Sequence, residues 1–151
     1  MRNLLDTALK QLSGHNCSEL ELRRHLEKEF NDLPQLDKEI DAILLHLHKL
    51  HLVNDMRVAD TMAQSYYHSS NRFISQVLRQ KGISEKIIEQ TLAVNGDEKE
   101  RALEASKRKL YILKGSVKMT ETDLICFLSS CGFLTESIYQ TIHQLQADGI
   151  L

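Results

Sequence analysis

The stretch Arg79-Gln80-Lys81-Gly82-Ile83 recurs fifty positions later as Ser129-Ser130-Cys131-Gly132-Phe133. Both stretches follow apolar residues at the same spacing, and both place a glycine at the same point. A glycine directly after an apolar-periodic segment is typical of the left-handed residue that ends a helix. Repetition at a period of about 50 residues indicates stacked supersecondary units, none of which can bury its apolar face alone.

A second alignment extends the repeat to the beginning of the sequence. A shift of ninety-eight positions lays the apolar residues of 40–53 onto those of 138–151. Helix signals occur in nine places, three in each unit, so we predict an all-α fold of three tandem three-helix repeats. The predicted repeats span 1–53, 54–96 and 97–151. We expect an interaction scaffold rather than an enzyme.

Capping residues mark the ends of these helices. Ser18 and Glu21 form a capping box, in which the serine hydroxyl accepts from the third helical amide and the carboxylate reaches back. Further helix starts are predicted at Asp37, Asn54-Asp55, Asn71, Ser84, Asp97, Thr120 and Thr135. Helix ends are predicted at Ser13-Gly14, Gly82, Asn95-Gly96, Lys114-Gly115-Ser116, Gly132 and Asp148-Gly149.

One stretch carries a conflicting signal. Residues 45–53 alternate apolar and polar side chains with period two, which favours a strand. The ninety-eight-residue shift places them on a helical pattern, and a single strand would have no partner in this chain. We therefore predict a helix through Lys49.

The composition is that of a globular, helical protein. Of 151 residues, 42% are hydrophobic and 26% are charged. With one proline and six glycines the chain has few residues that favour turns. No apolar run approaches the length of about 20 residues that spans a bilayer, and the chain opens on a helical pattern without a signal peptide. Three cysteines provide no disulfide framework. We expect a cytoplasmic protein with reduced thiols and no membrane association.

Charge is distributed unevenly around a net value of −2. Residues 1–55 hold 7 Lys/Arg against 10 Asp/Glu, residues 56–110 hold 10 against 7, and residues 111–151 hold 2 against 4. We therefore predict that any contact with a polyanion is made by the middle of the chain. A solvated helix surface with an incidental bias is the alternative.

Four motifs occur in one order along the chain: Ser18-x-x-Glu21-Leu22-Arg23-x-x-Leu26, His51-Leu52-Val53-Asn54-Asp55 followed by Ala59, Leu78-x-x-Lys81-Gly82-Ile83, and Phe127-Leu128 with Gly132-Phe133-Leu134. Together they resemble the RecX family of bacterial recombinase regulators, from about Leu4 to the end. The resemblance implies three tandem three-helix units in an elongated, curved array. It also implies binding to the RecA recombinase or its filament on single-stranded DNA, which limits filament growth or activity in recombination and DNA repair.

The chain departs from the family pattern in its central helix. The family commonly has Arg-Ile-Arg where this chain has Phe73-Ile74-Ser75, so two positive charges are missing beside Arg72. Val58 stands for the usual Phe before Ala, Asn54-Asp55 for a pair of aspartates, and Ser69-Ser70 for the common Gly-Tyr. These changes keep the fold and weaken the expected basic contact of the central unit.

The candidate binding residues of the central unit are Arg57, Arg72, Arg79, Lys81 and Lys86. Arg72 and Arg79 are seven apart, so on a helix they share a face about 10 Å along the axis and could meet successive phosphates or an acidic protein surface. In the alternative, Lys81 only complements a helix C-terminus and Arg79 is solvated.

Lys107, Arg108 and Lys109, with Arg101 and Lys114, form a second basic cluster late in the long predicted helix. Consecutive residues point about 100° apart, so the cluster is not one flat patch, and cations in last helical turns are common.

The aromatic pair Tyr66-Tyr67 with His68 could stack on bases of a single strand. Adjacent helical tyrosines more commonly divide into one core-facing and one rim-facing ring.

Metal and catalytic sites are not predicted. His48 and His51 could share a metal, but His46 points elsewhere and Cys17 is distant. Cys126 and Cys131 fall on different helix faces, and a small buried thiol is the expected state. The sequence contains no phosphate loop, no metal-spaced His/Glu set and no nucleophile with an evident base, so we expect no cofactor and no catalysis.

The sequence therefore predicts a monomeric regulator that binds RecA filaments and single- or double-stranded DNA. It leaves open which partner supplies more of the affinity. The alternative function is a helical-repeat protein–protein adaptor with no nucleic-acid or RecA role.

Overall fold

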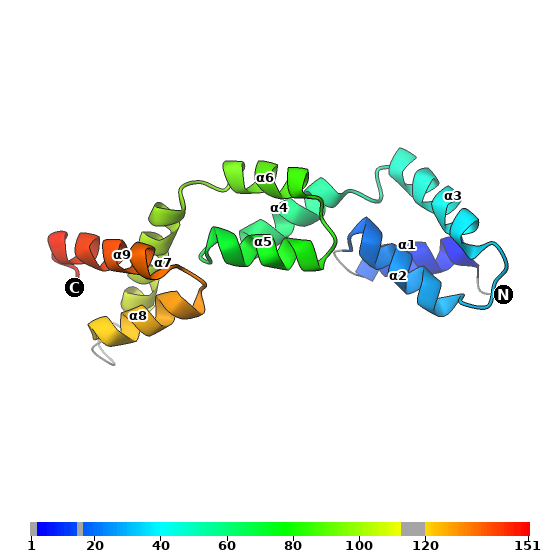
Figure 1. The fold of residues 1–151 in the computed structure, drawn as a ribbon. Coiled ribbons are helices and arrows are strands. Elements are labelled where there is room, and N and C mark those ends of the chain that lie inside the picture. Colours follow the sequence, from blue (N-terminus) through cyan, green and yellow to red (C-terminus); the bar gives the residue numbers. More distant parts are fainter. Residues whose placement is uncertain (1–2, 15–16, 113–119) are drawn as a thin grey trace. The chain divides into compact units, whose positions relative to one another are not determined.

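The computed structural model describes residues 3–14, 17–112 and 120–151, which form nine α-helices and no strand (Figure 1). The predicted all-α class is confirmed for these residues. The helices are α1 (Leu4–Gly14), α2 (Glu19–Glu29), α3 (Leu36–Lys49), α4 (Asp55–Ser65), α5 (Asn71–Gln80), α6 (Glu85–Val94), α7 (Glu98–Ile112), α8 (Glu121–Ser130) and α9 (Thr135–Ala147).

The chain divides into two compact units. The first comprises Met1–Met62 and Leu78–Thr91, and the second comprises Ala63–Val77 and Leu92–Leu151. The boundaries fall inside α4, α5 and α6, so each of these helices contributes one end to each unit. The division into three three-helix repeats and their elongated, curved array stay predictions.

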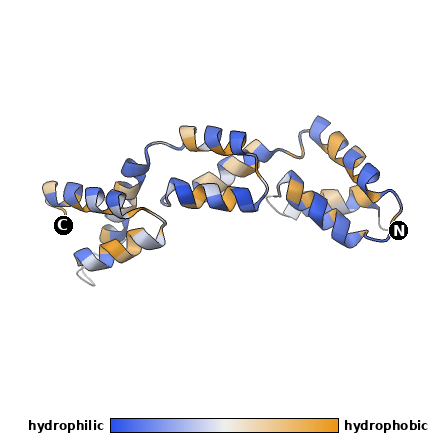
Figure 2. Cartoon of the chain, viewed as in Figure 1, coloured by the Kyte–Doolittle hydropathy of each residue, from blue (hydrophilic) through white to orange (hydrophobic). Residues whose placement is uncertain are grey.

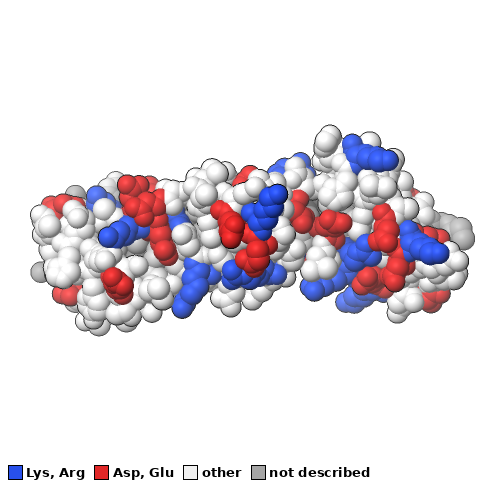
Figure 3. Space-filling model, turned by 45° about the horizontal axis from the view of Figure 1, so that its top comes forward, with Lys and Arg blue, Asp and Glu red and all other residues white. Residues whose placement is uncertain are grey.

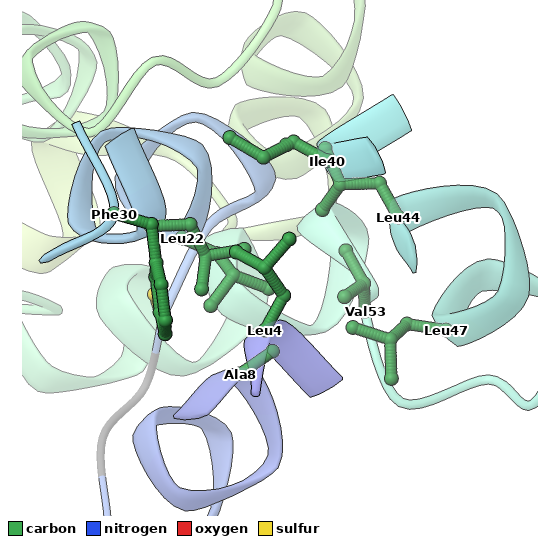
Figure 4. Close-up of a cluster of buried hydrophobic side chains, with 10 residues drawn as sticks. Leu4, Ala8, Leu22, Phe30, Ile40, Leu44, Leu47 and Val53 are labelled. Carbon is green, nitrogen blue, oxygen red and sulfur yellow. The ribbon is translucent and has the colours of Figure 1, made fainter. Parts of the chain in front are cut away.

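In the first unit, α1, α2 and α3 contact one another around an apolar core (Figure 4). Side chains spaced four apart on each helix face this core, because residues i and i+4 lie on one helical face. Figure 2 shows hydrophobic and hydrophilic residues mixed along the same helices, as this spacing requires. The buried residues are Leu4, Ala8, Cys17, Leu22, Leu26, Phe30, Ile40, Leu44, Leu47 and Val53.

The ambiguous stretch 45–53 is helical through Lys49, as predicted. Helix α3 continues to Lys49, with Leu47 fully buried and Leu45 58% exposed. His51 adopts a left-handed conformation (φ 58°), and the amide of Leu52 donates to the carbonyl of Leu47 at 3.0 Å. This hydrogen bond is the usual one for a left-handed helix end, here made without glycine.

In the second unit, α7, α8 and α9 contact one another around a core from all three helices. The predicted N-cap Thr120 accepts from the amide of Asp123, whose carboxylate accepts from the Thr120 amide, so α8 also begins with a capping box. The predicted helix break at 114–116 lies outside the described residues. The buried core residues are Ala102, Leu124, Leu128, Phe133, Ile138, Ile142 and Leu145.

The aromatic pair does not lie on a helix. Helix α4 ends at Ser65, so Tyr66 and Tyr67 form the turn before α5, and both are half-buried. The expected division into a core-facing and a rim-facing helical ring is wrong, because the helix ends before the pair.

The three cysteines differ in burial, and Cys131, expected as a small buried thiol, is only partly covered. Cys17 is buried and Cys131 half-buried, and burial raises the pKa of both thiols. Cys126 is exposed on α8, because it falls on the face opposite the core leucines.

Candidate functional site

In the first unit, Lys81 is held against the start of α2. Its ammonium donates to the Glu21 carboxylate at 2.8 Å, and its backbone carbonyl accepts from the Ser18 hydroxyl. The Ser18 oxygen also accepts from the Glu21 amide at 3.2 Å, and Glu21 accepts from the Ser18 amide at 3.1 Å. The predicted capping box is therefore confirmed, and Lys81 closes it from a distant part of the chain.

Two opposing effects set the pKa of the Glu21 carboxyl. Burial acts to raise it, but the hydrogen bonds from Lys81 and Ser18 and the lysine charge outweigh burial, so the pKa lies below its ordinary value of 4.5. The Lys81 side chain is 20% exposed. A lysine that is paired and largely covered in this way stabilises the fold. The prediction that Lys81 binds a partner stays untested.

Arg79 is also paired, although it is exposed. Its guanidinium makes two hydrogen bonds to the Glu85 carboxylate, at 2.5 and 3.1 Å, across the turn between α5 and α6. These hydrogen bonds raise the pKa of Arg79 and lower that of Glu85. The arginine side chain is 55% exposed, so a phosphate could reach it in competition with Glu85.

Arg57, Arg72 and Lys86 are exposed on α4, α5 and α6. In the part of the chain that the structure describes, none of their side chains forms an ion pair. Figure 3 shows cations and carboxylates interspersed on the face in view rather than one large positive patch. Contacts to a polyanion would therefore come from separate cations, each competing with nearby acidic groups.

Arg101 is not part of an exposed cluster, contrary to the expectation from its sequence position. Its side chain is buried at 1% exposure in the second unit. The guanidinium donates to the carbonyls of Tyr67 and Ser69, at 3.1 and 2.7 Å, and to the side-chain oxygen of Asn71. Burial lowers the pKa of Arg101, and its guanidinium carbon lies 6.0 Å from the Tyr67 ring centre.

This buried arginine holds the turn that carries the two tyrosines. The two carbonyls that accept from it belong to Tyr67 and Ser69, which are half-buried in the turn after α4. Tyr66 packs edge-on against Phe73, with ring centres 5.3 Å apart. Both tyrosines thus contact the chain itself, and base stacking on them stays an untested prediction.

The second basic cluster is divided by its helix, as expected for consecutive residues. Lys107 and Arg108 are exposed, whereas Lys109 is half-buried with its ammonium 5.2 Å from the Phe127 ring centre. Arg108, Lys109 and Phe127 line a hollow in the second unit together with His68. Two stretches singled out separately in the sequence therefore meet in the fold.

Sequence reasoning missed the role of two carboxylates at helix starts. Asp55, the first residue of α4, accepts from the amide of Glu19, the first residue of α2, at 3.0 Å. In the second unit, Glu98 at the start of α7 accepts in the same way from the amide of Asn71 at the start of α5, also at 3.0 Å. Each carboxylate satisfies a helix amide that has no partner within its own helix.

The repeated glycines belong to the same two junctions. Gly82 has φ +83° and a Cβ there would lie 2.7 Å from the Leu20 Cβ. Gly132 has φ +91°, and a Cβ there would lie 2.7 Å from the Ser70 hydroxyl oxygen and 3.0 Å from the Phe73 Cβ. Both sites need glycine for the backbone conformation and for the close approach of a neighbouring helix start.

Each compact unit therefore contains the same helix junction. In the first, the Ser18 hydroxyl donates to the carbonyl before Gly82, and in the second the Ser70 amide donates to the carbonyl of Cys131 before Gly132, at 3.0 Å. The sequence signal was present, because the two serines are 52 positions apart and the two glycines 50. Only the contacts between the helices show that these residues meet.

The residues described by the structure contain no group of three or more His, Cys, Asp or Glu side chains placed to hold a metal ion. His48 instead lies 3.2 Å from the Glu19 carboxylate. None of the helices in residues 3–14, 17–112 and 120–151 is long and apolar enough to cross a membrane.

The fold and these contacts define the class: an all-helical protein in which one type of helix junction occurs twice. Comparison with models of known protein families gives no match. The chain is 32% identical over 142 residues to the regulatory protein RecX of Chlorobaculum tepidum, covering 91% of this chain and 85% of that one. It is 29% identical over 147 residues to the RecX of Chlorobium phaeobacteroides, covering 95% and 94%. The chain belongs to the RecX family of regulatory proteins.

Solved structures show the same fold. A crystal structure of RecX from Lactobacillus salivarius matches with a TM-score of 0.73 at 22% identity, covering 95% of each chain. A second structure, of a regulatory protein RecX, matches with a TM-score of 0.67 at 24% identity, covering 93% of this chain and 70% of that one. The family resemblance read from the four motifs is confirmed.

Proposed function

We propose that this chain binds RecA filaments on single-stranded DNA and restrains their growth or activity, and so regulates recombination and DNA repair in the cytoplasm. The observation that carries the proposal is the 32% identity to a regulatory protein RecX over 91% of the chain. The exposed cations support it, because phosphate and acidic protein surfaces both attract separate lysines and arginines.

The mechanism needs no bond-making step. A protein that occupies a filament surface blocks the addition of further subunits or hinders strand exchange. Among the candidate cations, those that are exposed and form no ion pair within the described residues are Arg57, Arg72, Lys86, Lys107 and Arg108. Arg79 joins them when a phosphate replaces Glu85.

The departures from the family pattern support a weaker contact between the central helix α5 and a polyanion. Phe73 packs on Tyr66 and lies beside Gly132, and Ser75 is only 8% exposed. These two positions serve packing in this chain, whereas the family commonly has arginine there. Affinity for phosphates would then come from Arg72 and Arg79 on α5 and from cations outside it.

The experiment is RecA filament assembly on circular single-stranded DNA, with and without this protein. Filament length by electron microscopy and single-stranded-DNA-dependent ATPase are measured at protein below RecA stoichiometry. We expect shorter filaments and reduced ATPase, and a weaker effect for Arg72→Gln combined with Arg108→Gln. Filaments and ATPase that stay unchanged with excess protein would overturn the proposal.

An adaptor role is favoured by one observation, the exposed apolar side chains Leu45 (58%), Leu50 (52%), Leu52 (40%) and Met56 (40%) in the first unit. Salt titration separates the two functions. Phosphate-driven binding falls steeply between about 50 and 200 mM salt, whereas binding through an apolar surface changes little.

A further inference from the structure

The second unit contains a hollow of about 220 Å³, and Arg108, one of the exposed cations of the proposed function, lines it. It is lined by His68 in the turn after α4, by Ala105, Arg108 and Lys109 on α7, and by Phe127 on α8. The described residues that line it thus come from three separate segments of one compact unit.

Ala105 lines the hollow with only a methyl group. Ala105, Arg108 and Lys109 are at i, i+3 and i+4, so they share one face of α7. Ala105 is 2% exposed, and its methyl group leaves space that a larger side chain would fill. Met62 stands at the corresponding place in α4, seven positions after the helix-start carboxylate in both helices. The space is therefore a property of this helix rather than of the repeat.

The chemistry of the lining combines flat rings with positive charge. The Phe127 ring and the Ala105 methyl group provide an apolar wall, and His68 adds a second, polar ring. Arg108 is an exposed cation, and Lys109 holds its ammonium 5.2 Å from the Phe127 ring centre. Aromatic rings stack on nucleobases without sequence preference, and arginine and lysine neutralise the attached phosphate. A planar group carrying an anion satisfies both parts of the site.

We propose that this hollow is a nucleotide subsite that takes one unpaired base of a single strand, with its phosphate at Arg108. The inference rests on the proposed function, which supplies the single strand. The hollow is of the size of one nucleotide, and a base within a duplex does not offer its face to a side chain. Single-stranded DNA is therefore preferred over duplex DNA at this site.

The test measures binding of a 5′-labelled oligo-dT of about 20 nucleotides by fluorescence anisotropy, without RecA. Ala105→Leu fills the hollow and leaves every charge in place. We expect an affinity loss of about tenfold, the scale of one stacked base, with an unchanged slope of log affinity against log salt. Phe127→Leu, which removes the ring but keeps an apolar side chain, provides a second variant if Ala105→Leu lowers the melting temperature.

A matched pair of charge variants locates the phosphate. Arg108→Gln and Lys107→Gln remove the same charge from neighbouring exposed positions of α7, but only Arg108 lines the hollow. We expect Arg108→Gln to lower the salt slope by about one and Lys107→Gln to change it less. Equal effects of the two variants would overturn the placement of the phosphate.

The outcomes separate this subsite from the proposed function. Weaker oligonucleotide binding by Ala105→Leu supports the subsite, whether or not filament inhibition persists. Unchanged oligonucleotide affinity for both Ala105→Leu and Phe127→Leu overturns it. Unchanged affinity together with lost filament inhibition also overturns it, because the hollow would then receive a protein side chain.

Discussion

The hydroxyl of Ser18 donates a hydrogen bond to the backbone carbonyl of Lys81, 63 positions further along the chain. Ser18 is fully buried, and the same oxygen accepts from the amide of Glu21. One side chain thus caps helix α2 and fixes the end of α5 against it. Ser70 and Cys131 occupy the corresponding places in the second unit.

The junction glycines should be intolerant of a side chain. In Gly82→Ala, the left-handed backbone costs about 1 kcal/mol, and the clash with Leu20 adds about 1–3 kcal/mol. We therefore expect a loss of about 2–4 kcal/mol in the free energy of unfolding by urea. Gly132→Ala should behave alike because of its contact with Ser70.

Gly96→Ala is the matched control. Gly96 has nearly the same φ of +86°, but no atom lies within 4 Å of a Cβ placed there. Gly96→Ala should therefore lower the free energy of unfolding only by the backbone contribution of about 1 kcal/mol. Equal losses at Gly82 and Gly96 would show that the close helix approach contributes nothing.

Arg101 should be required for stability rather than for binding. Arg101→Met keeps the length of the side chain but leaves the Tyr67 and Ser69 carbonyls without their donor, so we expect a loss of about 2–4 kcal/mol in urea unfolding. Arg108→Met makes the same replacement at an exposed position of α7 and should change stability by about 0.5 kcal/mol or less. A stable Arg101→Met variant with weakened DNA binding would contradict this role.

The pair of Glu21 and Lys81 should make stability depend on acid pH. The folded-state pKa of Glu21 lies below the ordinary carboxyl value of 4.5, so its contribution is fully present above that value and is lost as pH falls through the lower, folded-state pKa. Glu21→Gln should therefore destabilise at pH 7 by about 1 kcal/mol and flatten the decline in stability below pH 4.5.

Urea unfolding at several pH values measures this dependence. Asp123→Asn provides a comparison, because the pKa of that carboxyl is also lowered, through hydrogen bonds with Thr120, but without a lysine. Identical acid profiles for unsubstituted protein and Glu21→Gln would rule out the proposed linkage.

Removing Glu85 should strengthen DNA binding. Glu85→Gln releases Arg79 from its two hydrogen bonds to a carboxylate, so we expect affinity for labelled oligo-dT to rise by about threefold at low salt. Glu89→Gln removes the same charge from another exposed position of α6 and should raise affinity less. A rise of equal size in both variants would mean that net charge, rather than release of Arg79, controls binding.

The helices could be read from the sequence because their signals are local. The two residues of the capping box, Ser18 and Glu21, are only three positions apart. Gly82 and Gly132 end their helices because glycine readily adopts the left-handed backbone conformation. For residues 45–53, which alternate with period two, a helix could be predicted only by comparison with the stretch ninety-eight positions later. The tyrosine pair was misplaced because nothing local marks the end of α4 at Ser65.

The candidate site depended on contacts that spacing does not encode. Arg101 resembles a member of a basic cluster in the sequence, yet the fold buries it beneath the 67–69 turn, because the carbonyls there need a donor that only the folded chain brings near. His68 and Phe127 are 59 positions apart and line one hollow.

The sequence alone determined the helical class, the caps at Ser18 and Thr120 and the family, because periodicity, cap chemistry and motif order are properties of neighbouring residues. Tertiary structure alone decided which cations are available. Lys81 and Arg101 are held by acceptors from distant segments, whereas Arg72 and Arg108 remain exposed on their helices. A charge acquires its role from the groups that surround it after folding, and those groups come from other parts of the chain.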